Sequence, residues 1–266
     1  MQEMFCFTLV KYSLIVFDFG PRSIRIEMEV DCTVDVYGDW HRQFMQAMLS
    51  RPALSTEELK QLVGNICGGE AINGTAQLKT FLKTVRDKVQ PLGLDLQKGT
   101  SERDGRPVYA LVNTSGGEET VACAAFSEPQ LRYLRALIQE VVTSVRGSIS
   151  VMAALNLAEG MSKSDAQALL RRLVRDCWLE DAEADGRVAL HTRCILEMEP
   201  YLVQHYGEHV PRCQLCSKIT VRGRMCERDG CGAKYHVHCV AKMRDRLGTM
   251  KCQACSSVIP NEVEQE

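Results

Sequence analysis

The sequence predicts a mainly helical α+β protein in which two winged-helix domains precede a small C-terminal domain folded around two zinc ions. Three observations support this. Seven of the 13 cysteines lie between Cys213 and Cys255 at metal-ligand spacing. From Asp39, three amphipathic helical patterns precede a β-hairpin pattern. After Gly116-Gly117, the same order of patterns recurs, which indicates a tandem repeat.

Composition and charge are those of a soluble globular protein. The chain has 266 residues, of which 45% are hydrophobic and 25% are charged, so two or three domains are expected. The formal charge is -2; seven thiolates and two Zn²⁺ ions would bring the loaded protein to about -5. The chain as a whole is therefore no polyanion binder, and any nucleic-acid contact needs a local basic patch.

The segment 1–38 is atypical and its structure is left open by the sequence. Its apolar stretch 4–10 is far shorter than the roughly 20 residues that cross a bilayer. No basic residue precedes that stretch and no clean cleavage site follows it, so we expect neither a membrane contact nor secretion. Alternating apolar residues over 24–36 suit a strand, whereas a disordered tail is the alternative.

The first winged-helix domain is predicted over 39–115. Asp39 is the expected cap of its first helix, which Pro52 ends, and the Ser55/Glu58 pair forms a capping box for the second. Asp104-Gly105 supplies the hairpin turn. The remaining expected elements are a helix over 75–89 and strands over 92–96 and 107–112.

The second winged-helix domain is predicted over 126–206. Ser127 and Gln130 form a capping box for its first helix, which should extend to Val145. Ser164 and Gln167 form a capping box for its third helix. A short helix is expected over 151–158, and Asp-Gly-Arg recurs in the second hairpin turn at 185–187. The helix expected over 192–206 carries an apolar stripe that could pack the zinc domain against this repeat; a plain connecting helix is the alternative.

Basic residues accompany the third helix of each repeat, where winged helices contact the DNA major groove. Acidic residues at 118, 119, 176 and 180 dilute this charge, and tandem winged helices dock proteins as readily as DNA. We therefore expect protein docking, with indirect or weak DNA contact. The basic candidates are Lys79, Lys83, Arg86 and Lys88 in the first repeat and Arg171, Arg172 and Arg175 in the second.

The C-terminal domain, 211–258, holds eight ligands in four pairs, enough for two tetrahedral Zn²⁺ ions. In a cross-brace, the first and third pairs share one ion and the second and fourth share the other. His236 has the H-x2-C spacing of a ligand, so His238 is interpreted as a bystander. The expected ligands are Cys213, Cys216, His236 and Cys239 for zinc site 1 and Cys226, Cys231, Cys252 and Cys255 for zinc site 2.

The metal should supply much of the folding energy of this domain, because it contains few large apolar residues. A disulfide framework is the rival interpretation, but no secretory signal supports it. Four-ligand sites leave no position for a reactive water, and no nucleophile with an adjacent base is evident. We therefore expect no catalytic residue, and any transferase activity would arise from holding a charged conjugating enzyme.

The motifs CQLC, CERDGC, YHVHC and CQAC, preceded by DGRPVYALVN and ILEMEPYL, resemble those of the first non-SMC element subunits of the SMC five/six chromosome-maintenance complex. The resemblance covers about 39–259. It implies a nuclear, chromosomal protein in homologous-recombination repair whose partners are a MAGE-type subunit, a kleisin subunit and the SMC five/six heterodimer. It also implies a variant RING domain with ubiquitin-protein ligase activity.

Two residues depart from ordinary RING domains: Gln253 stands where Pro is common, and Ser256 where a cation is common. Leu215, between the first two ligands, fits the apolar contact that RING domains offer a ubiquitin-conjugating enzyme. A PHD-like histone reader shares the ligand order, but Met250 stands where PHD modules usually place an aromatic residue. A non-catalytic docking subunit is the other alternative.

Overall fold

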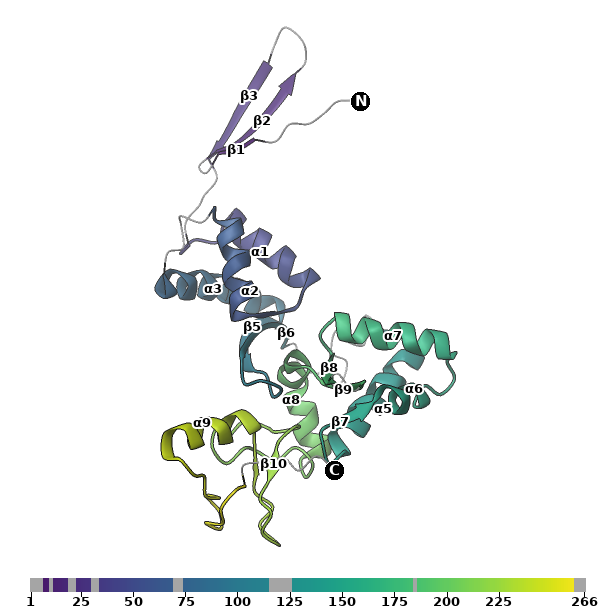
Figure 1. The fold of residues 1–266 in the computed structure, drawn as a ribbon. Helices are drawn as coiled ribbons and strands as arrows, with labels where there is room; N and C mark the ends of the chain where they lie inside the picture. The colour runs from purple at the N-terminus through teal and green to yellow at the C-terminus, as the bar shows by residue number, and fades with distance from the viewer. Residues whose placement is uncertain are drawn as a thin grey trace.

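The computed structural model describes residues 7–9, 12–18, 23–29, 34–68, 74–114, 126–183 and 186–260. In Figure 1 an N-terminal sheet stands apart from two helix-and-sheet units, and the zinc-ligand segment lies at the opposite end of the molecule. None of the helices within these ranges is long and apolar enough to cross a membrane.

The N-terminal sheet has three antiparallel strands in the order β1-β2-β3. The sequence left a strand over 24–36 or a disordered tail open, and residues 24–29 of that range form a strand. The strands are β1 (Phe7–Leu9), β2 (Tyr12–Asp18) and β3 (Ser23–Glu29).

The first unit contains the three predicted helices and the hairpin. Its sheet has the order β4-β6-β5 and covers a core that includes Phe44, Leu59 and Phe81. Strand β4 was not predicted. The elements are α1 (Asp39–Ser50), β4 (Ala53–Ser55), α2 (Thr56–Ile66), α3 (Thr75–Val89), the 3-10 turn η1 (Gln90–Leu92), β5 (Leu94–Thr100) and β6 (Pro107–Asn113).

The second unit repeats this order, and its sheet order β7-β9-β8 is equivalent to β4-β6-β5. In both units a short strand ahead of a helix pairs with the second strand of the hairpin. The elements are α5 (Glu128–Thr143), β7 (Ser148–Ser150), α6 (Val151–Asn156), α7 (Lys163–Arg175), β8 (Leu179–Glu183), β9 (Arg187–Leu190) and α8 (Thr192–Tyr206).

Helix termini follow the predicted capping chemistry in some places and not in others. The Ser55/Glu58 box forms as expected, with both hydrogen bonds present. The cap of α1 is Gly38, and Asp39 lies in its first turn. The expected extension of α5 to Val145 was wrong, because the helix ends at Thr143 and Val145 is 94% exposed.

The predicted start of α7 was also wrong. Ser162, and not Ser164, caps this helix: its hydroxyl accepts a hydrogen bond from the Asp165 backbone N–H at 3.1 Å. The chain offers serines two residues apart, each followed three residues later by a polar side chain, so the local pattern does not discriminate between them.

Helix α8 lies at the junction of all three parts. Its residues Ile195 and Leu202 belong to the core of the second unit, and Met198 packs against that core. The same core includes Ile219 and Val221 from the zinc-ligand segment. The apolar stripe therefore packs the C-terminal domain against the second repeat, as one of the two interpretations predicted. Figure 1 shows the β5–β6 hairpin extending from the first unit toward this helix.

Candidate metal centre

The eight predicted ligands form two compact clusters. Within each, the potential ligand atoms lie within 4.8 Å of one another. The surrounding elements are β10 (Arg224–Met225), β11 (Lys234–Tyr235) and α9 (Val237–Leu247). One cluster is Cys213, Cys216, His236 and Cys239 and the other is Cys226, Cys231, Cys252 and Cys255, the same division that the cross-brace predicts.

The two C-x2-C pairs adopt the same tight turn. The Ser217 backbone N–H donates to the Cys213 carbonyl at 2.8 Å, and the Ser256 N–H donates to the Cys252 carbonyl, also at 2.8 Å. Both serines have left-handed backbone torsions, with φ of 60° and 62°. Ser256, which departs from the RING pattern, therefore occupies the conformation that closes the turn and presents both sulfurs to one point.

The remaining pairs depend on a short hairpin and a helix start. Gly230 and Gly232 have φ of 73° and 63°, a region open to glycine without steric cost, and they bring Cys231 back toward the cluster, as expected. His236 is the N-terminal cap residue of α9, whose first turn carries Cys239. The third pair is thus positioned by helix geometry.

The distances between ligand atoms suit tetrahedral zinc. Zn–S bonds of about 2.3 Å place two sulfurs roughly 3.8 Å apart. The Cys226–Cys255 and Cys231–Cys252 sulfur pairs are separated by 3.5 and 3.6 Å. The Nδ1 atom of His236 lies 3.3 and 3.8 Å from the sulfurs of Cys216 and Cys239. The residues therefore fit two Zn²⁺ ions.

The histidine orientation separates the ligand from its neighbour. His236 turns Nδ1 toward the sulfurs, while its Nε2 lies 3.0 Å from the Ile219 carbonyl oxygen. The His238 ring stacks on the His236 ring, with centroids 4.8 Å apart, and belongs to neither cluster. The structure thus places His236, the histidine that the spacing favoured, in the first ligand cluster and leaves His238 outside both clusters.

Negative charge concentrates around the first cluster. Burial lowers the pKa of His236, but the Glu102 carboxylate and nearby thiolates outweigh burial and raise it to about 9. Burial raises the pKa of Cys213, but backbone N–H donors, first that of His236, outweigh it and bring the pKa to about 7. An environment that favours a proton on His236 and a thiolate on Cys213 also favours a metal cation.

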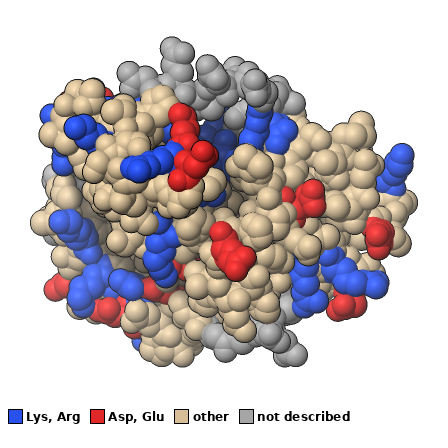
Figure 2. Space-filling view, turned by 90° about the horizontal axis from the view of Figure 1, so that it is seen from below, with Lys and Arg blue, Asp and Glu red and all other residues tan. Residues whose placement is uncertain are grey.

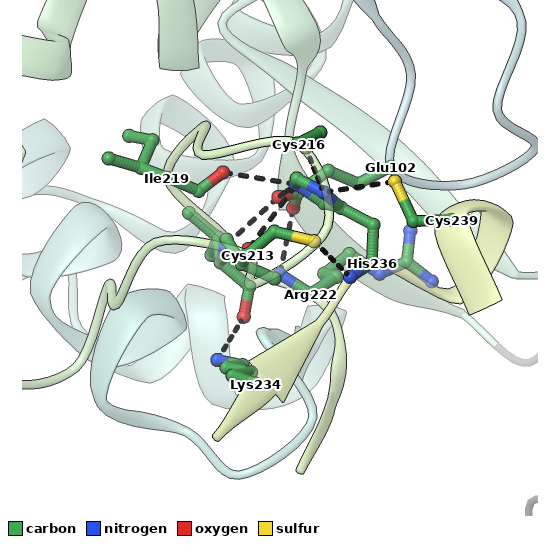
Figure 3. Close-up of polar contacts among 10 residues, drawn as sticks. Glu102, Cys213, Cys216, Ile219, Arg222, Lys234, His236 and Cys239 are labelled. Carbon is green, nitrogen blue, oxygen red and sulfur yellow. Dashed lines mark hydrogen bonds and ion pairs between the residues drawn. The ribbon is translucent and has the colours of Figure 1, made fainter. Parts of the chain in front are cut away.

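Glu102 is the residue of this site that sequence reasoning missed. It lies in the β5–β6 turn of the first unit, more than 100 residues before the ligands, yet its carboxylate Oε1 is 3.2 Å from His236 Nε2. Figure 3 shows it beside the cysteine and histidine side chains. A glutamate in a charged hairpin turn indicates a solvent-exposed side chain, so no local pattern could have identified it.

Comparison with known proteins gives this arrangement a family. A model of the RING-like domain matches residues 213–255. A model described as the Nse1 non-SMC component of the SMC5-6 complex matches residues 41–159 and 151–198. The chain belongs to the Nse1 family.

The relatives span almost the whole chain. Non-structural maintenance of chromosomes element 1 homolog from Bos taurus is 31% identical over 86% of this chain and 87% of its own length. The Homo sapiens homolog is 30% identical over 86% of each chain, and the Schizosaccharomyces pombe protein is 21% identical over 84% of this chain and 93% of its own. A chain of a solved Nse1-Nse3-Nse4 complex superposes with a TM-score of 0.75 at 28% identity, covering 86% of this chain and all of that one.

The RING-like match favours the RING interpretation of the zinc domain over the PHD interpretation. Leu215 is partly buried against the domain core and Gln253 is exposed, whereas Met250 is buried. Leu215 therefore presents part of its side chain to solvent between the first two ligands.

Most of the predicted basic residues form ion pairs with acidic side chains. Arg86 binds Asp95 through two hydrogen bonds of 2.6 and 3.0 Å, and Lys83 pairs with Asp87. Arg172 and Arg175 both contact Asp176. Figure 2 shows Lys and Arg interspersed with Asp and Glu on the face in view. The expected indirect or weak DNA contact stays an untested prediction.

Proposed function

We propose that this chain acts as the Nse1-type subunit of an SMC5-6 complex in homologous-recombination repair, on chromosomes in the nucleus. Its winged-helix domains, 39–115 and 126–206, would dock a MAGE-type and a kleisin subunit. The family match and the superposition on a chain of an Nse1-Nse3-Nse4 complex support this assignment, because that complex pairs an Nse1 chain with two further non-SMC subunits.

We further propose that the zinc domain, 211–258, is a RING-type ubiquitin-protein ligase acting together with the MAGE-type partner. The observation that carries the proposal is the pair of four-ligand clusters within a RING-like domain. Zinc would have a scaffolding role there, since four protein ligands leave no coordination position for substrate. The domain would hold a conjugating enzyme whose own thioester carries the chemistry.

Leu215 is the proposed anchor for the conjugating enzyme. Its position between the first two ligands is fixed by the turn that both cysteines form, and its side chain is only partly covered by the domain core. Truncation of an apolar anchor at an interface costs about 1 to 3 kcal/mol of binding. Leu215→Ala should therefore reduce ubiquitin chain formation at least several-fold while both zinc ions and complex assembly are retained.

The assay is ubiquitin transfer by the reconstituted complex with its MAGE-type partner, across a panel of conjugating enzymes, with zinc content measured in parallel. Met225→Ala is the matched control, since Met225 is 56% exposed on β10 and lies outside the first ligand pair. Absence of transfer by the wild-type complex with every enzyme would support a non-catalytic docking subunit. Robust transfer that Leu215→Ala leaves unchanged would support the ligase proposal but contradict the proposal that Leu215 contacts the conjugating enzyme.

A further inference from the structure

The turn of the β5–β6 hairpin, residues 101–106, is inserted between the zinc domain and the second unit. Its Glu102 is 8% exposed, and the Arg103 guanidinium donates to the Asp181 carbonyl in β8 at 3.1 Å. Opposite, Gly105 packs so closely on His238 that an added Cβ would lie 2.5 Å from the His238 Cβ. The first unit is therefore in direct contact with zinc site 1.

Both carboxylate oxygens of Glu102 have partners in the zinc domain. Oε1 accepts the Val221 backbone N–H at 3.0 Å and lies 3.2 Å from His236 Nε2, and Oε2 accepts the Arg222 N–H at 2.7 Å. A buried carboxylate without such donors costs several kcal/mol. Glu102 is therefore stable at this position only while the Val221–Arg222 segment and the His236 ring are held in place.

The Val221–Arg222 segment is also held from its other sides. The Arg222 guanidinium pairs with Glu180 of β8 at 3.2 Å, and both side chains are 15% exposed. The buried Lys234 ammonium donates to the Val221 carbonyl at 2.9 Å (Figure 3). A Cβ on Gly147 would lie 2.7 Å from the same carbonyl oxygen. Glu180 thus stabilises the same junction as Glu102, but no contact joins it to His236 among the described residues.

We propose that Glu102 is a positioning residue of zinc site 1, supplied by the first unit, and that zinc binding at this site is coupled to docking of the first hairpin. A histidine that binds zinc through Nδ1 carries its proton on Nε2. That N–H lies between the Ile219 carbonyl and the Glu102 carboxylate, which fixes the ring and makes it a stronger donor to the metal. This inference concerns metal binding and holds whether or not the domain is a ligase.

The coupling is reciprocal. If docking of the hairpin strengthens zinc binding at site 1 by some factor, zinc at site 1 strengthens docking by the same factor. Site 2 provides the internal reference, because its four cysteines have no contact with Glu102 in the described structure.

The test uses the full chain loaded with zinc, and the variants Glu102→Gln and Glu180→Gln. Glutamine keeps the size of each side chain but removes the charge and replaces one acceptor oxygen by an NH2 donor. Zinc affinities of the two sites are measured by chelator competition. Cadmium-113 NMR of the substituted protein distinguishes site 1, with three cysteines and one histidine, from site 2, with four cysteines. Hydrogen exchange at the Val221 and Arg222 amides reports docking of the hairpin.

For Glu102→Gln we expect about 10- to 100-fold weaker binding at site 1, an unchanged site 2, and faster exchange of the two amides. Glu180→Gln loosens the same junction without a contact to His236, so it should weaken site 1 much less than Glu102→Gln does and leave site 2 unchanged. Wild-type affinity at site 1 in Glu102→Gln, or the same loss in both variants, would overturn the proposal. Should Glu102→Gln not fold, Glu102→Asp retains the charge on a shorter side chain; it should also weaken site 1 alone, and wild-type affinity in that variant would overturn the proposal equally.

Discussion

Replacing Gly105 with alanine should separate the first hairpin from the zinc domain. Gly105 has φ of 71°, so an L-residue there is strained by about 1 to 2 kcal/mol. Its new Cβ would also lie 2.5 Å from the His238 Cβ, a separation that requires one side to move. Overpacking of this kind costs typically about 1 to 3 kcal/mol. The expected total is therefore roughly 2 to 5 kcal/mol.

Gly186→Ala is a matched control in the same chain. Gly186 stands in the second copy of Asp-Gly-Arg and has φ of 72°, but an added Cβ there would meet no atom of the described residues within 4 Å. The backbone strain should be the same at the two positions, about 1 to 2 kcal/mol. The difference between the two variants therefore measures the contact between the hairpin and the zinc domain.

Thermal unfolding of the zinc-loaded chain, together with hydrogen exchange at the Val221 and Arg222 amides, checks this prediction. We expect Gly105→Ala to lower the unfolding temperature more than Gly186→Ala does. It alone should also accelerate exchange of the two amides, because both donate to Glu102 in the displaced turn. Equal destabilisation by the two substitutions, with both amides still protected, would refute the reasoning.

Two further predictions concern zinc binding and helix capping. His236→Ala should weaken zinc binding at site 1 by about 3 kcal/mol, a quarter of the roughly 12 kcal/mol typical of a four-ligand structural site. His238→Ala should retain both ions. Metal analysis showing equal zinc loss in the two variants would contradict the ligand assignment. Ser162→Ala should lower the free energy of unfolding, measured by urea titration, by about 1 kcal/mol through loss of the α7 cap. Ser164→Ala should lower it by much less. A larger effect at Ser164 would show that the capping residue is wrongly assigned.

The parts of the structure that were predictable from sequence are those in which the chemistry is local. The zinc ligands fall in pairs separated by two to four residues, so a single turn, hairpin or helix start determines each pair. The Ser55/Glu58 box likewise lies within four residues. A few neighbouring residues determine the geometry of each such pattern, which is why the sequence predicted the two clusters and the start of α2.

The missed features depend on contacts between distant parts of the chain. Strand β4 has three residues, too few for an alternating pattern, and exists because β6 pairs with it across more than 50 residues. The hydrogen bond from the Val221 N–H to Glu102 spans 119 residues. Nothing in the neighbourhood of Glu102 distinguishes its carboxylate from an exposed one.

The two Asp-Gly-Arg turns show where local information ends. Both glycines adopt nearly the same left-handed torsion, a region that glycine enters without steric cost. Among the described residues, Gly105 of the first turn packs against the zinc domain and Gly186 does not. The first turn also carries Glu102, which finds three donors in the zinc domain. Because a buried carboxylate is stable only with its donors in place, the orientation of the zinc domain and the position of the first hairpin depend on each other.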